Sequence, residues 1–208
     1  MIPVKILAVR FLANASPELA RALGAPEGYR SLGLITTDCD DATYIALDEA
    51  TKAAEVKVCY GRSFYAGAAN ASTPHAGEVM GILAGATPGA VKSGMDAVIA
   101  ALGTVGFEQV GEVPYLAHTV SSCGSYLAEL ADVPMGSPVA YLIAPPLEAM
   151  YAMDSALKAS DVRLCKLYAP PSETNFGGGL LTGTQSACHA ACEAFAAAVS
   201  EVATKPIE

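Results

Sequence analysis

The segment LDEATKAAEVKVC at residues 47–59 returns as MDSALKASDVRLC at residues 153–165. Placing Asp154 on Asp48 sets an offset of 106 residues (154 − 48), and six of the thirteen positions are then identical. Each version has the pattern of a helix that is followed by a strand with alternating apolar residues. A repeat of this kind is typical of a duplicated structural unit.

The similarity between the two halves extends on both sides of this segment. Upstream, residues 18–36 align with residues 126–144 at an offset of 108 (126 − 18), and downstream, residues 90–102 align with residues 187–199. The chain therefore reads as two copies of one domain, with residues 1–106 as the first and residues 107–208 as the second.

Each copy has the same order of secondary-structure signals. A strand, a short helix, a second strand, a helix, a third strand, a glycine-rich loop with a further strand, and an alanine-rich helix follow one another. Ser16 before Pro17 and Thr87 before Pro88 are typical of an N-cap and the first residue of a helix. Because the intervals between strands are too irregular for successive βαβ units, we expect an α/β (α+β) layer repeated twice and not a parallel doubly wound sheet.

The expected boundaries follow from these signals. Strands are expected at residues 4–12, 32–36, 56–60, 113–120, 139–144 and 162–168, and the central helices at residues 47–54 and 147–159.

Composition limits the class of protein. Of 208 residues, 52% are apolar and 16% are charged, which favours a globular chain with a sizeable core. A net charge of −9 without a basic cluster argues against nucleic-acid and anionic-membrane partners. The N-terminus is read as a strand and not a signal peptide, and the six cysteines are read as reduced, so a cytosolic protein is expected.

Four segments carry a resemblance to a known family: DDATYIALDEATKAAEVKVCYGRSFYAGAA, AHTVSSCGSYL, AYLIAPPLEAMYAMDSALKASDV and PPSETNFGGGLLTGTQSAC. They resemble the tandem-domain, trimeric shell proteins of bacterial microcompartments, and the resemblance covers nearly the whole chain. It implies two circularly permuted microcompartment domains, a homotrimer that forms a flat pseudohexagonal tile, and neighbouring shell proteins as partners at the edges of the tile.

An acidic run, TTDCDDATY at residues 36–44, is present only in the first copy. Asp38, Asp40 and Asp41 could form a solvated loop, or, less favourably, hold Mg²⁺ or Ca²⁺, although the glycine and the distal glutamate of a calcium loop are missing. The resemblance implies a third interpretation, in which Asp40 and Glu78 line a narrow pore through each subunit and attract a small amine such as ethanolamine. Asp41 and His118 are further candidates for the lining of that pore.

Two further groups of residues gain a role from the resemblance. The loops 62–77 and 170–183 are expected to surround a central pore of the trimer, where the three glycines 177–179 make rearrangement easy. Lys52 and Lys158, in the two Asp-x-x-x-Lys motifs, are expected at the shell edge; read without the family, they form i,i+4 ion pairs on a solvated helix face. The central-pore candidates are Phe64, Tyr65, Thr174, Asn175, Phe176, Gly177 and Gly178.

Signals for an enzyme are weak. Cys123 could be the nucleophile of a hydrolase, but no phosphate loop or Gly-x-Ser-x-Gly motif is present, and Cys188, His189 and Cys192 lack the fourth ligand of a zinc site. We therefore expect no catalytic site, no metal and no cofactor. The alternative to a shell protein is a soluble tandem-domain regulator that binds a small amine.

Overall fold

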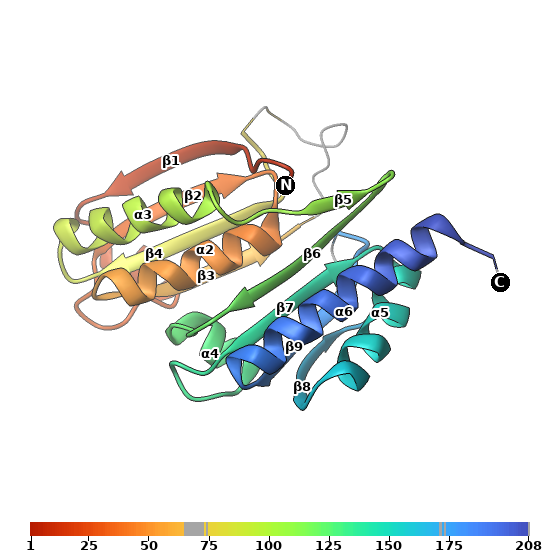
Figure 1. Cartoon of the computed structure of the whole chain (residues 1–208). Helices are drawn as coiled ribbons and strands as arrows, with labels where there is room; N and C mark the ends of the chain where they lie inside the picture. The colour runs from red at the N-terminus through yellow and green to blue at the C-terminus, as the bar shows by residue number, and fades with distance from the viewer. Residues whose placement is uncertain (65–72, 74, 171, 173, 208) are drawn as a thin grey trace. The chain divides into compact units, whose positions relative to one another are not determined.

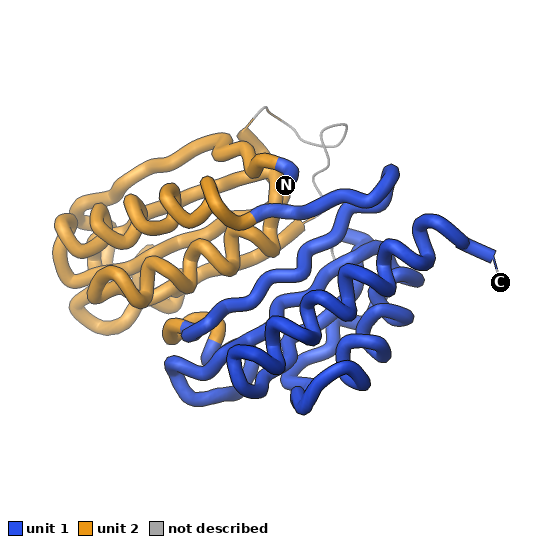
Figure 2. The backbone as a smooth tube through the Cα atoms, viewed as in Figure 1, with its two compact units in different colours: residues 1–2, 106–123, 128–208 blue, residues 3–105, 124–127 orange. Residues whose placement is uncertain are grey.

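The computed structural model describes residues 1–64, 73, 75–170, 172 and 174–207 (Figure 1). The chain forms two compact units (Figure 2). Unit 2 contains Pro3–Val105 and Gly124–Leu127, and unit 1 contains Met1–Ile2, Gly106–Cys123 and Ala128–Glu208.

Unit 2 is a four-stranded antiparallel sheet in the order β1-β2-β4-β3. Helices α2 and α3 lie side by side on one face of this sheet. The side chains at the centre of the unit are fully buried and apolar, among them Ile45, Leu83 and Met95. The elements are β1 (Ile6–Leu12), α1 (Pro17–Ala22), β2 (Ser31–Thr37), α2 (Asp40–Ala53), β3 (Val56–Ser63), β4 (Val79–Gly85) and α3 (Pro88–Leu102).

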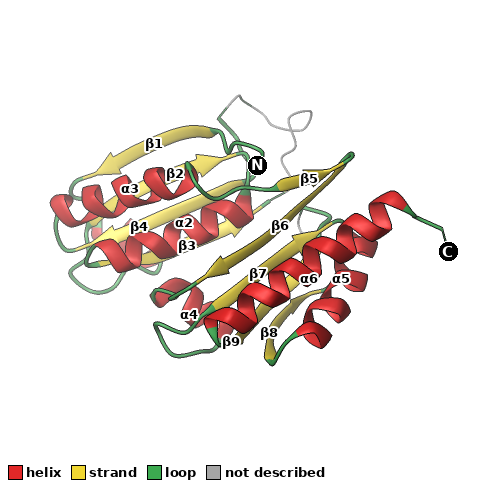
Figure 3. Cartoon of the chain, viewed as in Figure 1, coloured by secondary structure: helices red, strands yellow, loops and turns green. Residues whose placement is uncertain are grey.

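Unit 1 repeats this plan with a five-stranded antiparallel sheet in the order β5-β6-β7-β9-β8 (Figure 3). Helices α5 and α6 pack on the sheet around a core that includes Leu142, Met153 and Phe195. The elements are β5 (Glu108–Val110), β6 (Val113–Val120), α4 (Ser125–Ala131, whose first three residues belong to unit 2), β7 (Val139–Ala144), α5 (Pro146–Ala159), β8 (Val162–Tyr168), β9 (Gly177–Gly183) and α6 (Gln185–Thr204).

The helix starts follow the sequence signals. The Ser16 hydroxyl accepts a hydrogen bond from the Leu19 N–H, the Thr87 hydroxyl accepts from Ala90 N–H, and Pro17 and Pro88 occupy first helical positions. The expected caps of α1 and α3 are therefore confirmed. The antiparallel pairing of both sheets confirms that the fold is not a parallel doubly wound one.

Strand β1 starts at Ile6 and not at residue 4, and β3 continues to Ser63 and not only to residue 60. Two further boundaries differ more. Helix α2 begins at Asp40 and not at Leu47, so the acidic run lies partly in a helix. Residues 177–183, expected to belong to a loop, form β9 in the middle of the sheet, and Gly177 and Gly178 are buried there.

Close approach of neighbouring strands explains the glycines of β9. A Cβ on Gly178, whose φ is +147°, would lie 1.9 Å from the Leu142 carbonyl oxygen, and a Cβ on Gly179 would lie 2.3 Å from the Lys166 carbonyl oxygen. The glycines therefore permit tight strand packing, and they lie in a strand and not in the expected loop.

All six cysteines are free. Cys59 and Cys165, which are equivalent in the sequence repeat, lie at the same register shift of β3 and β8. Within the described residues, no helix combines the length and apolar character that a membrane span requires.

Candidate functional site

The pairing of three strands gathers acidic residues at one end of the sheet in unit 2. Val79 of β4 pairs with Thr37 of β2 on one side and with Ser63 of β3 on the other. Glu78 therefore leaves the sheet at the same end as the acidic run that follows β2. Its backbone N–H donates to the Thr37 carbonyl at 2.8 Å, which fixes this position.

The first turn of α2 places Asp40 and Asp41 at this end. Their side chains are only 8% and 7% exposed, which rules out a solvated loop at these two positions. The Cys39 N-cap position supplies no side-chain cap; instead the hydroxyls of Thr37 and Thr43 hydrogen-bond each other at 2.7 Å, and Cys39 N–H donates to the Thr37 hydroxyl. This network starts the helix earlier than its apolar pattern indicates.

Burial and like charge act together on the carboxyl groups. Burial raises the pKa of Asp40, although hydrogen bonds from the Asp41 N–H and from Ser63 oppose the shift. Burial also raises the pKa of Glu78, and the neighbouring charges of Asp40 and Asp38 raise it further. This end of the sheet thus concentrates acidic side chains, and a cation beside them would relieve their repulsion.

Sequence reasoning missed two polar neighbours of this cluster, Ser63 and Tyr44. Ser63 hydrogen-bonds Asp40 and Tyr44, and burial raises the pKa of Tyr44 to about 12. The rings of Tyr44 and Tyr126 lie 6.1 Å apart, and Tyr126 packs where a side chain on Gly61 would lie. Tyr44 follows Asp40 by four residues, a spacing that places both on one helix face once α2 is known to begin at Asp40.

Among the described residues of unit 1, the positions that correspond to Asp40, Asp41 and Glu78 carry no carboxylate. The register of β4 and β9 aligns Gly81 with Gly179, so Phe176 corresponds to Glu78, and Pro146 at the start of α5 corresponds to Asp40. The sequence comparison had placed Gly178 or a neighbour opposite Glu78; the register identifies the neighbour as Phe176. The acidic cluster is specific to the first copy, as the sequence predicts.

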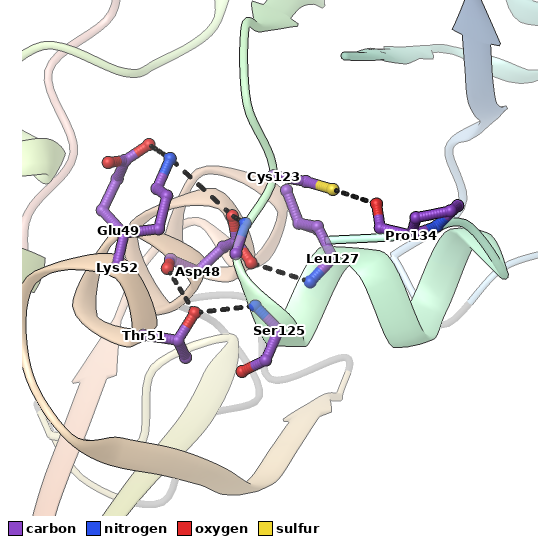
Figure 4. Close-up of polar contacts among 9 residues, drawn as sticks. Asp48, Glu49, Thr51, Lys52, Cys123, Ser125, Leu127 and Pro134 are labelled. Carbon is purple, nitrogen blue, oxygen red and sulfur yellow. Dashed lines mark hydrogen bonds and ion pairs between the residues drawn. The ribbon is translucent and has the colours of Figure 1, made fainter. Parts of the chain in front are cut away.

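The two Asp-x-x-x-Lys motifs have different environments. The Asp48 side chain is fully buried and accepts hydrogen bonds from the Gly124 N–H at 2.7 Å and the Leu127 N–H at 2.8 Å (Figure 4). Burial raises the pKa of Asp48, and these hydrogen bonds oppose the shift. Lys52 lies 3.9 Å from Asp48 and also pairs with Glu49. The solvated ion pair expected here is therefore wrong for Asp48.

The second motif matches the solvated interpretation. Lys158 and Asp154 lie 2.6 Å apart, with 75% and 64% of their side chains exposed. Lys52 is less accessible, with 29% of its side chain exposed. The shell-edge role of both lysines stays a prediction.

Other candidate residues are distributed over both units. Phe64 lies at the end of β3 and its N–H donates to the Glu78 carbonyl at 3.0 Å. His118 lies in β6 opposite Tyr141, in unit 1 and not in the unit of the acidic cluster. Tyr65 lies outside the described residues.

The loop before β9 holds the remaining central-pore candidates. Asn175 has a positive φ of 63°, and its N–H donates to the Ser172 carbonyl at 3.2 Å. Phe176 N–H donates to the Ser172 hydroxyl, and its ring meets Phe107 edge to face at 5.7 Å between centroids. Thr174 is partly buried in the turn. Where these residues lie in a trimer stays a prediction.

The hydrolase alternative finds no support in the geometry. Cys123 is 2% exposed, and its thiol donates to the Pro134 carbonyl at a sulfur–oxygen distance of 3.7 Å (Figure 4). A buried thiol of this kind is a packing residue and not an accessible nucleophile. Among the described residues, no group of three or more His, Cys, Asp and Glu side chains is arranged to hold a metal ion.

Comparisons with known proteins agree with this geometry. A family model of the BMC domain matches residues 31–113. The bacterial microcompartment shell protein EutL of Clostridium perfringens is 56% identical over an alignment that covers 100% of this chain and 97% of that protein. The protein of the same name from Escherichia coli is 50% identical with the same coverage.

A solved structure extends the match to three dimensions. The crystal structure of ethanolamine utilization protein EutL from Leptotrichia buccalis superposes with a TM-score of 0.96 at 56% identity, covering 100% of this chain and 97% of that one. The fold and family expected from the sequence are thereby confirmed, and the relatives are shell proteins and not enzymes. The chain belongs to the EutL family of bacterial microcompartment shell proteins.

Proposed function

We propose that this shell protein assembles as a homotrimeric tile in the bacterial cytoplasm, and that the acidic cluster of unit 2 lines a narrow pore for a small amine such as ethanolamine. Residues 1–106 and 107–208 each supply one microcompartment domain to the tile. Neighbouring shell proteins meet the tile along edges that include Lys52 and Lys158.

The burial of like charges is the observation that carries the pore proposal. Asp40 and Asp41 are nearly inaccessible, Glu78 is partly buried, and the charges of Asp40 and Asp38 add to burial in raising the pKa of Glu78. A bound ammonium group relieves this repulsion and donates hydrogen bonds to the carboxylates. A small molecule with one ammonium and one hydroxyl group fits this donor set, because Ser63 and Tyr44 add hydroxyls beside the acids.

Titration calorimetry with ethanolamine tests the pore proposal. Asp40→Asn and Glu78→Gln should each lower the affinity about tenfold or more, since each removes a charged hydrogen bond. Asp96→Asn is the matched control, because Asp96 is exposed on α3 and pairs only with Lys92 in the described contacts. If the native protein and the three variants bind ethanolamine equally well, the acidic cluster is not the amine site.

Solution mass and negative-stain imaging at rising concentration test the assembly. Trimers that associate into flat arrays support the tile, and Lys52→Ala or Lys158→Ala should abolish the arrays while the trimers persist. Discrete oligomers that never form sheets would instead favour the soluble amine-binding regulator. The central-pore role of Phe64, Tyr65 and residues 174–178 belongs to the same proposal and requires a trimer.

A further inference from the structure

Asp48 of α2 lies on a helix face that a distant segment of the chain covers. The turn Gly124–Leu127, which belongs to unit 2, lies against α2, and the Asp48 carboxylate accepts from two backbone N–H groups of this turn. Thr51 adds a third contact, since its hydroxyl accepts from Ser125 N–H at 3.0 Å. The unpaired N–H groups at the start of α4 are thereby satisfied.

Helix α5, the counterpart of α2, exposes the corresponding face to solvent. Leu147 is 66% exposed and Tyr151 is 40% exposed, whereas the equivalent positions of α2, Asp41 and Ile45, are 7% and 1% exposed. Asp154, the counterpart of Asp48, is largely exposed and pairs with Lys158 on its own helix. A face that is buried in one copy and exposed in the other lacks the element that covers it.

The missing element has a counterpart in the same sequence. Helix α4 aligns with α1 at an offset of 108 (127 − 19), so Gly124, Ser125 and Leu127 correspond to Ser16, Pro17 and Leu19. Leu19 is 44% exposed on α1. Since α1 is already part of unit 2 of its own chain, the turn that fits α5 is available from a second copy.

Two substitutions between the repeats compensate each other at this contact. Thr51 corresponds to Leu157, which has no hydroxyl to accept a hydrogen bond. Ser125 corresponds to Pro17, which has no N–H to donate. Donor and acceptor are absent together, so pairing α1 with α5 leaves neither group unsatisfied.

We propose that the exposed face of α5 binds the first turn of α1 from a second copy of this chain, with Asp154 accepting a hydrogen bond from the Ser16 hydroxyl. Gly124 has no room for a side chain, because a Cβ there would lie 2.7 Å from the Asp48 carbonyl oxygen. Ser16 therefore lies slightly farther from α5 than Gly124 lies from α2, and its hydroxyl fills the gap. The Ser16 hydroxyl accepts from the Leu19 N–H at 3.3 Å. In the proposed contact it also donates a hydrogen bond to the Asp154 carboxylate.

This contact rests on the proposed self-assembly and makes it specific. The α5 face and the α1 turn are different surfaces, so the contact is heterologous, and its repetition closes a ring or extends a filament. The trimer of the proposed function is the smallest closed ring beyond a dimer that this contact can build.

A double-mutant cycle measured by sedimentation tests the contact. Asp154→Ala and Ser16→Ala should each weaken self-association about tenfold, and the double variant should be no weaker than about the worse single variant. Asp96→Ala is the matched control, because Asp96 forms the same exposed i,i+4 pair, with Lys92, and should change association less than about twofold. Additive effects of the two variants would overturn the contact.

Mixing two singly substituted proteins gives a second readout that does not depend on affinity. Ser16→Cys and Asp154→Cys chains should form a disulfide-linked pair under mild oxidation, whereas Ser16→Cys with Asp96→Cys should not. Trimers that form normally with no cross-link and no coupling would overturn this inference and leave the proposed function standing. A native chain that never self-associates would instead overturn the proposed assembly itself.

Discussion

Helices α2 and α5 carry the same Asp-x-x-x-Lys motif in opposite surroundings. Asp48 of α2 is completely buried and binds backbone N–H groups of a turn that lies 76 and 79 residues further along the chain. Asp154 of α5 is 64% exposed and pairs with Lys158 one turn away. A repeated sequence therefore specifies the helix, whereas burial depends on which distant segment covers it.

The largest expected effect separates the two aspartates. Asp48→Ala should lower the free energy of unfolding by about 4 kcal/mol, because it leaves the buried N–H groups of Gly124 and Leu127 without an acceptor. Asp154→Ala should cost less than about 0.5 kcal/mol in the dissociated chain, since it removes an exposed ion pair. Urea unfolding of dilute protein measures both, and equal losses would show that burial does not distinguish them.

The second expected effect concerns equivalent positions of β4 and β9. Met80 carries a full side chain in β4, but its counterpart Gly178 has no space even for a methyl group. Gly178→Ala should therefore destabilise by about 3 kcal/mol through overpacking and its positive φ.

Gly111→Ala is the control for that substitution. Gly111 also has a positive φ, of 58°, but nothing lies within 4 Å of an added Cβ. The Gly111→Ala substitution should lower the free energy of unfolding by only about 1 kcal/mol, which is the cost of the backbone conformation. Thermal unfolding measures both variants. A Tm for Gly178→Ala equal to or higher than that of Gly111→Ala would contradict the close approach of the strands at Gly178.

These differences also mark what the sequence could predict. Local patterns located β6, β7 and β8 at their observed bounds and the caps at Ser16 and Thr87. They failed for the start of α2, because the Thr37–Thr43 hydroxyl pair that supports it joins a strand to a helix. Local patterns also read the glycines of β9 as a flexible loop, since a tripeptide of glycine does not reveal a backbone packed against it.

The candidate site was predictable in part. The acidic run and its absence from the second copy could be read directly, and Asp40 with Glu78 followed from the family resemblance. Their shared location depends on the register of β2, β4 and β3, which no local pattern contains. Ser63 was missed because an isolated serine at a strand end has no signal of its own.

The third expected effect is a pH dependence of amine binding at the acidic end of unit 2. The pKa values of Asp40 and Glu78 are raised, so the carboxylates take up protons above the usual range of about 4. Ethanolamine affinity should fall as the pH is lowered from 7 toward 5, because protonated acids no longer attract the ammonium group.

The contribution of these two acids to the free energy of unfolding should instead increase as the pH is lowered. A raised pKa in the folded state means that folding favours the protonated acids, so their contribution is full at low pH and is lost as the pH rises through the folded-state pKa. Glu78→Gln should flatten both the binding and the stability profiles. Binding that strengthens on acidification would contradict the assignment of these carboxylates as the amine site.

The smallest expected effect converts one version of the repeated contact into the other. Thr51→Val should cost about 1 kcal/mol, because Ser125 N–H loses its acceptor at 3.0 Å. Adding Ser125→Pro removes that N–H and places proline at the first position of α4, as Pro17 is placed in α1. The double variant should regain most of the lost stability. If Ser125→Pro is equally harmful in the native chain and in the Thr51→Val variant, the hydroxyl and the N–H do not act as a pair, and the correspondence between the two turns fails at this position.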